Sequence, residues 1–162
     1  LLESKEQEGS KFVAQFKDVT IINSVHVEEN SVENFSINDI DASILIVDDI
    51  KTNRLLVSML LESDTITLFE AENGKKGLEV AQNMDSLQLV ILDWNMPVMS
   101  GKETLMKLRL MNQDVLILVM IKFEKKDSVM EAITLGATNY VLKPFRVNEF
   151  QDKIKEVIDN AA

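Results

Sequence analysis

From Ala42 onward, short apolar runs alternate with amphipathic helical patterns, and this alternation restricts the chain to very few folds. Each apolar run has the length of one strand and is bounded by polar or turn-forming residues. The predicted strands cover residues 43–47, 65–69, 87–92, 115–121 and 140–142. The predicted helices cover residues 53–61, 74–82, 102–110 and 125–135, and a last helix is marked by Val147, Phe150, Ile154 and Val157.

Strands that are apolar on both faces and separated by helices predict a parallel sheet covered on both sides. We therefore expect an α/β fold of the doubly wound type with five parallel strands and five helices. The strand order 2-1-3-4-5 is the one known for flavodoxin-like sheets and is adopted here by analogy with them. Within the helix predicted over residues 53–61, Leu56, Met59 and Leu60 form the expected buried stripe. This domain is expected to occupy residues 42–162, after a short extended or linker segment.

Composition excludes several classes of function. The net charge of −10 over 162 residues argues against nucleic acid as a partner. The absence of cysteine excludes disulfides and thiol catalysis. No apolar run approaches the roughly 18 residues that cross a bilayer, so we expect no membrane contact by this chain and a cytoplasmic location. The chain does not begin with Met, and we expect a longer parent protein that other segments could anchor in a membrane.

Charged side chains follow three of the predicted strands. Asp48 and Asp49 follow the first strand, Asp93 follows the third, and Lys143 follows the fifth. Ligands of open parallel sheets bind at the carboxyl ends of the strands, near the point where the strand order reverses. Three carboxylates that meet there repel one another, and Mg²⁺ is a cation that such oxygen ligands hold well. One carboxylate can then attack phosphorus, while the lysine neutralises charge on the transferred group.

Each of these features has a plainer interpretation when it is taken alone. An Asp-Asp pair after a strand is usually a turn or a helix cap, and an Asp-x-Asn-x-Pro segment is usually a turn. A Lys-Pro pair is commonplace. Their occurrence in this order, each at the end of a predicted strand, favours a shared site.

The stretch from Ser43 to about Asn160 resembles a receiver domain of two-component signalling systems. The segments that carry the resemblance are ILIVDD (44–49), NRLL (53–56), AENGKKGLE (71–79), LVILDWNMPVMSG (89–101) and LGATNYVLKPF (135–145). The resemblance implies that Asp93 is the phosphoacceptor and that Lys143 contacts the phosphoryl group, with Pro144 in the cis form. It implies that Asp49, Asp93 and the main-chain carbonyl of Asn95 bind Mg²⁺, and that Asp48 acts through water.

One part of the resemblance fails at the end of the fourth strand. Receivers carry Thr or Ser there, followed by a small residue, and the hydroxyl helps to reposition an aromatic side chain on strand five. Counting back from Gly136 places Ile121 at the hydroxyl position and Lys122 at the small one, whereas the aromatic residue is present as Tyr140. We therefore expect phosphorylation to produce a weaker or different conformational change, and Lys122 is a candidate to contact the phosphoryl group instead.

The first forty residues differ in character. The segment SKEQEGSKFVAQF (4–16) resembles the end of the ATP-binding domain of histidine kinases, although a generic hairpin explains it as well. On that interpretation residues 1–22 are a kinase tail, residues 23–41 are a linker, and the parent is a hybrid sensor histidine kinase. His26, the only histidine, lies in the linker without a helical pattern around it, and we interpret it as solvated.

The leading hypothesis is a receiver that accepts a phosphoryl group on Asp93 from a phosphohistidine of a histidine kinase core or a histidine phosphotransfer protein. Such a chain is not an enzyme by itself, beyond its own phosphorylation and dephosphorylation. The alternatives are a pseudo-receiver that serves only as an interaction module, and a Mg²⁺-dependent hydrolase, against which Asn95 counts because a second catalytic Asp belongs there. We also expect Trp94 to be half exposed, Phe123 to lie near the site, and the 125–159 region to offer a homodimer face.

Overall fold

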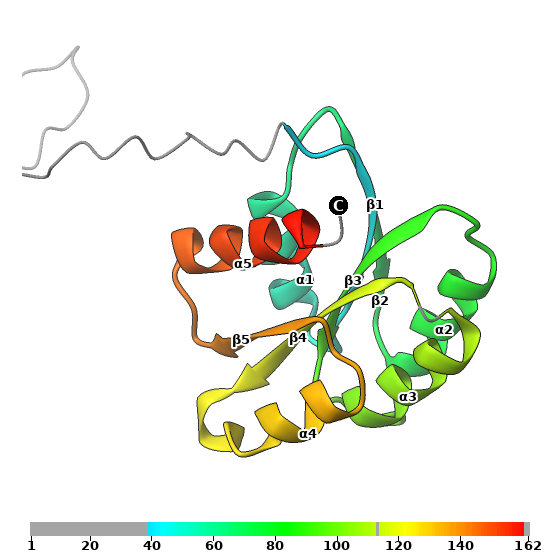
Figure 1. The fold of residues 1–162 in the computed structure, drawn as a ribbon, viewed down its shortest axis with the longest axis vertical. Helices are drawn as coiled ribbons and strands as arrows, with labels where there is room; N and C mark the ends of the chain where they lie inside the picture. The colour runs from blue at the N-terminus through cyan, green and yellow to red at the C-terminus, as the bar shows by residue number, and fades with distance from the viewer. Residues whose placement is uncertain (1–38, 113, 161–162) are drawn as a thin grey trace, which may run out of the picture. The chain divides into compact units, whose positions relative to one another are not determined.

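The computed structural model describes residues 39–112 and 114–160, and these form a five-stranded parallel sheet with helices on both faces (Figure 1). The strands are β1 (Ala42–Val47), β2 (Ile66–Ala71), β3 (Leu87–Asp93), β4 (Leu116–Lys122) and β5 (Asn139–Lys143), in the order β2-β1-β3-β4-β5. The helices are α1 (Lys51–Leu60), α2 (Gly74–Gln82), α3 (Gly101–Met111), α4 (Ser128–Thr134) and α5 (Val147–Asp159). The predicted α/β fold, strand order and number of helices are confirmed.

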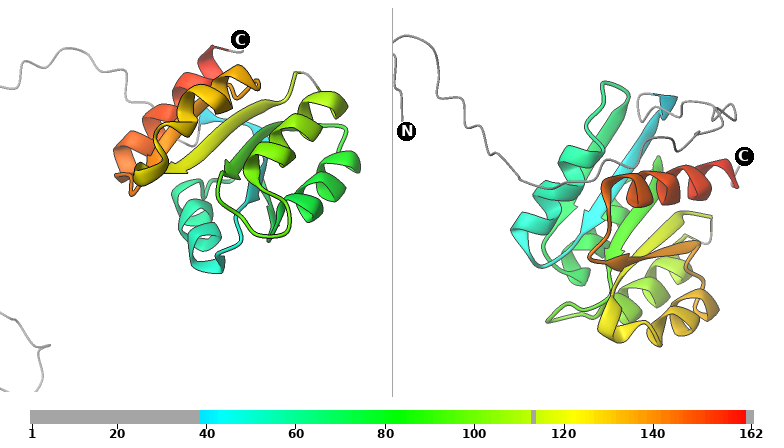
Figure 2. Two further views of the ribbon diagram at one scale, coloured as in Figure 1. Left: turned by 90° about the horizontal axis from the view of Figure 1, so that it is seen from below. Right: turned by 90° about the vertical axis from the view of Figure 1, so that its left-hand side faces the viewer.

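Helices cover both faces of the sheet (Figure 2), and an apolar layer joins them to the sheet on each face. On one face α1 and α5 bury Val57, Leu61, Phe150, Ile154 and Val157 against the sheet. On the other face α2, α3 and α4 pack against a second cluster, which includes Leu105, Leu108 and Ala132. The three central strands are buried on both faces and therefore read as continuous apolar runs in the sequence.

Helix α1 turns a different stripe to the core from the predicted one. Leu56 is 49% exposed and Met59 is 64% exposed, whereas Val57 and Leu61 are almost fully buried. Apolar residues occupy nearly every position from Leu55 to Leu61. The helical period therefore could not determine which of them face the core. The first residue of α5, Val147, is likewise 53% exposed rather than part of its buried stripe.

Other element bounds differ from the predicted ones by one or two residues, except around α4. A short 3₁₀ turn, η2 (Phe123–Lys125), follows β4, and α4 begins only at Ser128. The amides of Lys126 and Val129 donate to carbonyls three residues back, a tighter pattern than the predicted continuous α-helix over 125–135.

The connection from β3 to α3 is tightly built. Ser100 caps α3, because its side chain accepts from the amide of Glu103 while the Glu103 carboxylate accepts from the amide of Ser100 at 3.0 Å. A side chain at Gly101 would collide with the main-chain carbonyl of Asp93, so only glycine permits this close approach. The loop between them holds Val98 at a positive φ of 70°, which is unfavourable for a β-branched residue.

The predicted kinase tail (1–22) and residues 23–38 of the predicted linker, His26 among them, lie outside the described residues. Among the residues described, no helix is both long and apolar enough to cross a membrane.

Candidate functional site

The three predicted carboxylates meet at the carboxyl edge of the sheet. Asp48 and Asp49 follow β1, Asp93 ends β3, and one oxygen from each lies within 4.8 Å of the others. Because β1 and β3 are neighbours in the sheet, their ends meet at the point where the strand order reverses. Asp48 is fully buried and Asp93 is 1% exposed, so two of these acids lie almost out of contact with water.

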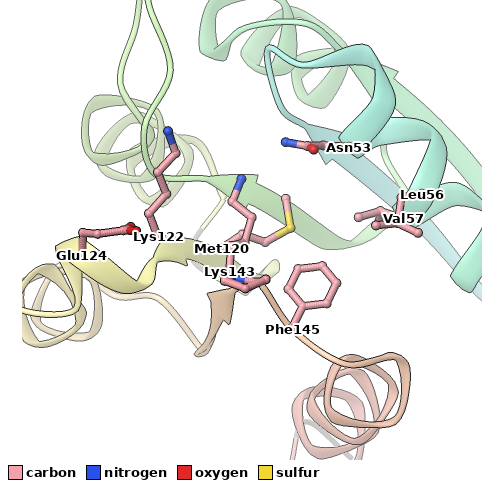
Figure 3. A pocket seen from close by; sticks show the side chains of 9 residues that line it. Asn53, Leu56, Val57, Met120, Lys122, Glu124, Lys143 and Phe145 are labelled. Carbon is pink, nitrogen blue, oxygen red and sulfur yellow. The ribbon is translucent and has the colours of Figure 1, made fainter.

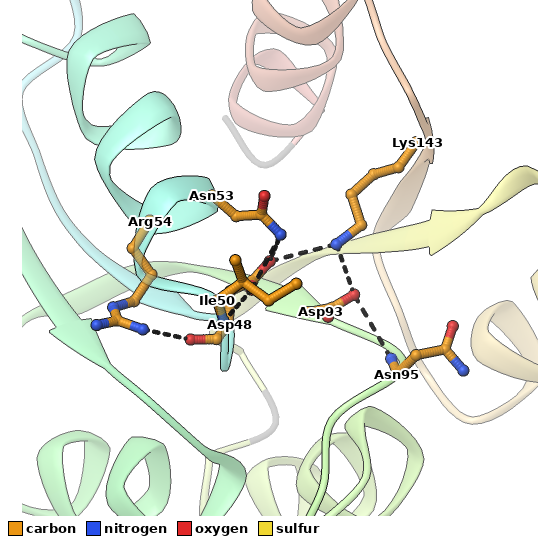
Figure 4. A network of polar contacts seen from close by, with 7 residues as sticks. All are labelled: Asp48, Ile50, Asn53, Arg54, Asp93, Asn95 and Lys143. Carbon is orange, nitrogen blue, oxygen red and sulfur yellow. Dashed lines mark hydrogen bonds and ion pairs between the residues drawn. The ribbon is translucent and has the colours of Figure 1, made fainter.

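Asp48 is held by donors from several elements (Figure 4). The Asn53 amide nitrogen donates to both carboxylate oxygens, at 3.2 Å and 3.0 Å, and the amide of Ile50 donates to Oδ1 at 2.8 Å. Arg54 donates to the main-chain carbonyl of Asp48 at 2.8 Å and pairs with Glu70 of β2 at 3.0 Å. The first turn of α1 thus fixes the orientation of this acid.

Lys143 reaches across from the end of β5 to two of the acids. Its Nζ lies 2.9 Å from Oδ1 of Asp93 and 3.2 Å from Oδ2 of Asp48. The Lys143–Pro144 peptide bond is cis, as predicted. Burial raises the pKa of Asp93 above its ordinary value, although the ammonium group of Lys143 and the Asn95 amide oppose that shift.

Asp49 differs from its neighbours in having an unsatisfied oxygen. Within residues 39–112 and 114–160, its Oδ1 is the one buried side-chain oxygen or nitrogen without a hydrogen-bond partner. A buried acceptor without a donor costs free energy, and a cation among the three acids would remove that cost. The donor set is all oxygen, which suits a hard cation such as Mg²⁺. The residues present therefore fit the predicted metal.

The predicted switch residues occupy different surroundings. Ile121 is fully buried in the apolar layer beneath α3 and α4, and Tyr140 is half-buried against the same layer. Lys122 is exposed at the last position of β4. Asn95 follows the acceptor strand, and its amide lies 3.5 Å from Oδ1 of Asp93.

A groove of about 510 Å³ opens beside the acids, between α1 and the ends of β4 and β5 (Figure 3). Its walls combine apolar and charged side chains, namely Asn53, Leu56, Val57, Met120, Lys122, Glu124, Lys143, Pro144 and Phe145. Phe123 does not line this groove, and its ring is 55% exposed in the η2 turn.

Sequence reasoning missed two contributors and misplaced one. Asn53 and Arg54 were noted only as part of the NRLL segment that resembles receivers, and their contacts with Asp48 were not predicted. Their position about one helical turn after Asp48 and Asp49 could have indicated those contacts. Trp94 is 6% exposed and not half exposed, because its amide continues the sheet ladder to the carbonyl of Met120 at 2.9 Å and its ring joins the apolar layer.

A doubly wound sheet with three acids and a lysine at its carboxyl edge is the arrangement expected for a signalling module of the receiver type. The chain belongs to the response regulator receiver domain family, whose pattern it matches over residues 44–155. Solved structures agree with this assignment. A response regulator receiver domain protein from Clostridium thermocellum is 27% identical with a TM-score of 0.68, and the match covers 74% of this chain and 95% of that one. Chemotaxis protein CheY4 of Vibrio cholerae is 31% identical with a TM-score of 0.63, covering 73% and 99% respectively.

Two relatives indicate the range of proteins that carry this domain. Sporulation initiation phosphotransferase F of Bacillus subtilis is 30% identical over 115 residues, which is 71% of this chain and 92% of that protein. Histidine kinase P4 of Formosa agariphila is 34% identical over 137 residues, which is 83% of this chain but only 10% of that protein. The same domain therefore occurs both as nearly a whole protein and as a small part of a large kinase.

Proposed function

We propose that Asp93 accepts a phosphoryl group from a phosphohistidine, with Lys143, Asp48 and Asp49 assisting. The observation that carries this proposal is the ion pair between Lys143 Nζ and Asp93 Oδ1 at 2.9 Å, beside an acid with an unsatisfied buried oxygen. A buried carboxylate positioned by a lysine is an oriented nucleophile, and the same lysine can neutralise charge on the group that arrives.

The groups that would hold Mg²⁺ are the carboxylates of Asp49 and Asp93 and the main-chain carbonyl of Asn95, with Asp48 acting through water. Asp48 suits the indirect role, because donors from Asn53, Ile50 and Lys143 already satisfy its two oxygens. When bound, the ion would neutralise the acids and the phosphoryl oxygens, as phosphoryl transfer requires.

In the transfer, an oxygen of Asp93 bonds to phosphorus while the bond from phosphorus to the histidine nitrogen breaks. The imidazole leaves with the electron pair of that bond and regains a proton from solvent. Lys143 then exchanges its contact with the Asp93 oxygen for one with a phosphoryl oxygen, so its charge stays compensated throughout.

The proposed donor is a histidine kinase core or a histidine phosphotransfer protein that docks on α1. Four apolar side chains of this region are exposed close to the acids, at between 45% and 64% of their surface: Ile50, Leu55, Leu56 and Met59. An exposed apolar cluster beside a reactive group is typical of a protein interaction site. A receiver domain by itself catalyses only its own phosphorylation and dephosphorylation.

We further propose that the parent is a hybrid sensor histidine kinase, with residues 1–22 as its kinase tail, residues 23–41 as a linker and residues 42–162 as the receiver. The match to Histidine kinase P4 covers 83% of the chain, which is more than residues 42–162 alone, so it includes residues before Ala42. The receiver would act in the cytoplasm, where the ATP that histidine kinases use is found.

The switch that follows phosphorylation is proposed to be atypical, since Ile121 offers no hydroxyl to a phosphoryl oxygen and lies buried. The region of α4, β5 and α5 remains the proposed homodimer face. It exposes Met130 (72%), Ile133 (40%) and Val147 (53%), and sedimentation of the protein with and without a phosphate mimic would test it.

Incubation with acetyl phosphate and Mg²⁺, followed by mass spectrometry, tests the proposed function. A stable gain of one phosphoryl group that Asp93→Asn abolishes is expected. No gain would favour the pseudo-receiver, and steady release of inorganic phosphate would favour a hydrolase.

A further inference from the structure

The ends of β4 and β5 place two lysines side by side. Lys122 and Lys143 are register partners in the parallel pair, and both side chains line the groove beside the acids. Met120, two residues before Lys122 on the same side of the strand, also lines that groove. In Figure 3 both ammonium groups point upward in the view, away from the strand ends that carry them.

The two lysines differ in their charge partners. Lys143 pairs with Asp93 and Asp48, whereas no ion pair or hydrogen bond involves the Lys122 ammonium group within the described part of the chain. Like charges on register partners of neighbouring strands repel each other, which costs free energy unless an anion lies between them. The pair is therefore arranged for a negative group that arrives from outside.

We infer that Lys122 is a second cationic ligand of the phosphoryl group on Asp93, which it approaches from the groove side of β4, whereas Ile121 on the other side offers no hydroxyl. This inference rests on the proposed function. Phosphorylation replaces one carboxylate charge by an acyl phosphate with two. Asp48, Asp49 and the phosphoryl group would then carry four negative charges, against three positive charges on Lys143 and a divalent ion. Lys122, the register partner of Lys143, supplies a fourth positive charge.

Glu124 places a negative charge in the same groove as Lys122. Its carboxylate lines the same groove as Lys122, yet the two form no ion pair, so Glu124 opposes an anion without neutralising the lysine. Removing the charge of Lys122 and removing that of Glu124 should consequently change anion binding in opposite directions.

The test is titration of the protein with beryllofluoride in Mg²⁺, followed by Trp94 fluorescence, together with the rate of phosphorylation by acetyl phosphate. Lys122→Met keeps the length of the side chain and removes its charge. It should weaken beryllofluoride binding and slow phosphorylation by about tenfold, the usual effect of losing a charged hydrogen bond. Lys122→Arg should retain most of both, and Glu124→Gln should strengthen binding by up to about threefold. Raising the salt concentration should narrow the difference between wild type and Lys122→Met.

Lys125→Met is the matched control, because Lys125 is an exposed lysine of the adjacent η2 turn that does not line the groove. It should leave both measurements unchanged. Equal effects of Lys122→Met and Lys125→Met would overturn the inference in favour of a net-charge effect. Normal binding by Lys122→Met would overturn it while the proposed function stands, and failure of wild type to bind beryllofluoride or gain a phosphoryl group would overturn both.

Discussion

The acidic side of the site and the end of β4 contribute to one space, but they are built differently. Asp48 accepts hydrogen bonds from an amide and two side chains, and Gly101 packs directly on the carbonyl of Asp93. At the end of β4, Ile121 is sealed in the apolar layer and Lys122 extends into an open groove. One side is fixed by polar contacts before any ligand binds, whereas the other offers a buried apolar residue and a free charge.

The difference separates two properties that a receiver combines. Orienting the proposed nucleophile depends on the acids and Lys143, which the structure brings together. Transmitting a change to a distant surface depends on groups that move, and the proposal of an atypical switch concerns Ile121 at the end of β4.

Lys143→Met should have the largest effect. It removes the charge nearest to the acceptor oxygen and should slow phosphorylation by acetyl phosphate by roughly a hundredfold, as loss of one preorganised electrostatic contact commonly does. Quantitative mass spectrometry over time measures this rate. A rate within threefold of wild type would show that Lys143 is not needed to orient Asp93. Lys107→Met, at an exposed position of α3 away from the groove, serves as the control and should leave the rate unchanged.

Mg²⁺ should stabilise the wild-type protein by about 2.7 kcal/mol at a concentration one hundred times its Kd. Asp49→Asn should lose most of this gain, because Asp49 carries the unsatisfied oxygen. Thermal denaturation with and without Mg²⁺ measures both values. Asp41→Asn, an exposed acid outside the cluster, should retain the full gain.

The stability measured by thermal denaturation should also depend on pH, and Asp93 determines the sign of one part of that dependence. Burial raises its pKa in the folded state, so the contribution of Asp93 to the stability of the cation-free protein should be lost as the pH rises through that pKa. Asp93→Asn should flatten this part of the stability curve. The stability of wild type minus that of Asp93→Asn, both without the cation, should therefore fall over this pH range, and a rise in that difference would contradict the assignment.

Ile121→Thr should cost roughly 2 kcal/mol of stability, because it removes apolar volume from a fully buried position and adds a hydroxyl. In return it should allow Tyr140 to move inward in the beryllofluoride complex, which nuclear magnetic resonance of the ring would detect. Wild type should show no such movement. If the wild-type ring does swing inward, the proposal of an atypical switch is wrong.

Val98→Asn should have the smallest effect, a gain of about 1 kcal/mol in the free energy of unfolding. Asparagine tolerates the positive φ of 70° that is unfavourable for valine, and the side chain is 83% exposed, so little packing is lost. Chemical denaturation measures the gain. The rate of phosphorylation should stay within twofold of wild type, and a larger change would indicate that the strain of this loop serves the acidic side.

The sequence alone predicted the parallel sheet and the positions of the acids at strand ends, because strands buried on both faces carry continuous apolar runs. The strand order, which the structure confirms, came by analogy with flavodoxin-like folds. It could not predict which residues of α1 face the core, because its consecutive apolar residues are compatible with more than one buried face. It also missed Asn53 and Arg54, whose contacts to Asp48 depend on the angle at which α1 leaves β1. Trp94 was misplaced because a strand end can continue its hydrogen bonds beyond the last apolar residue.

The functional side chains described above come mainly from the carboxyl ends of β1, β3, β4 and β5 and from the first turn of α1. The acids and Lys143 lie outside the two apolar clusters that join the helices to the sheet, whereas Ile121 belongs to one of them. The residue at the end of β4 can therefore differ without displacing the acids around Asp93. A receiver built in this way can differ in its response to phosphorylation while keeping the groups that accept the phosphoryl group.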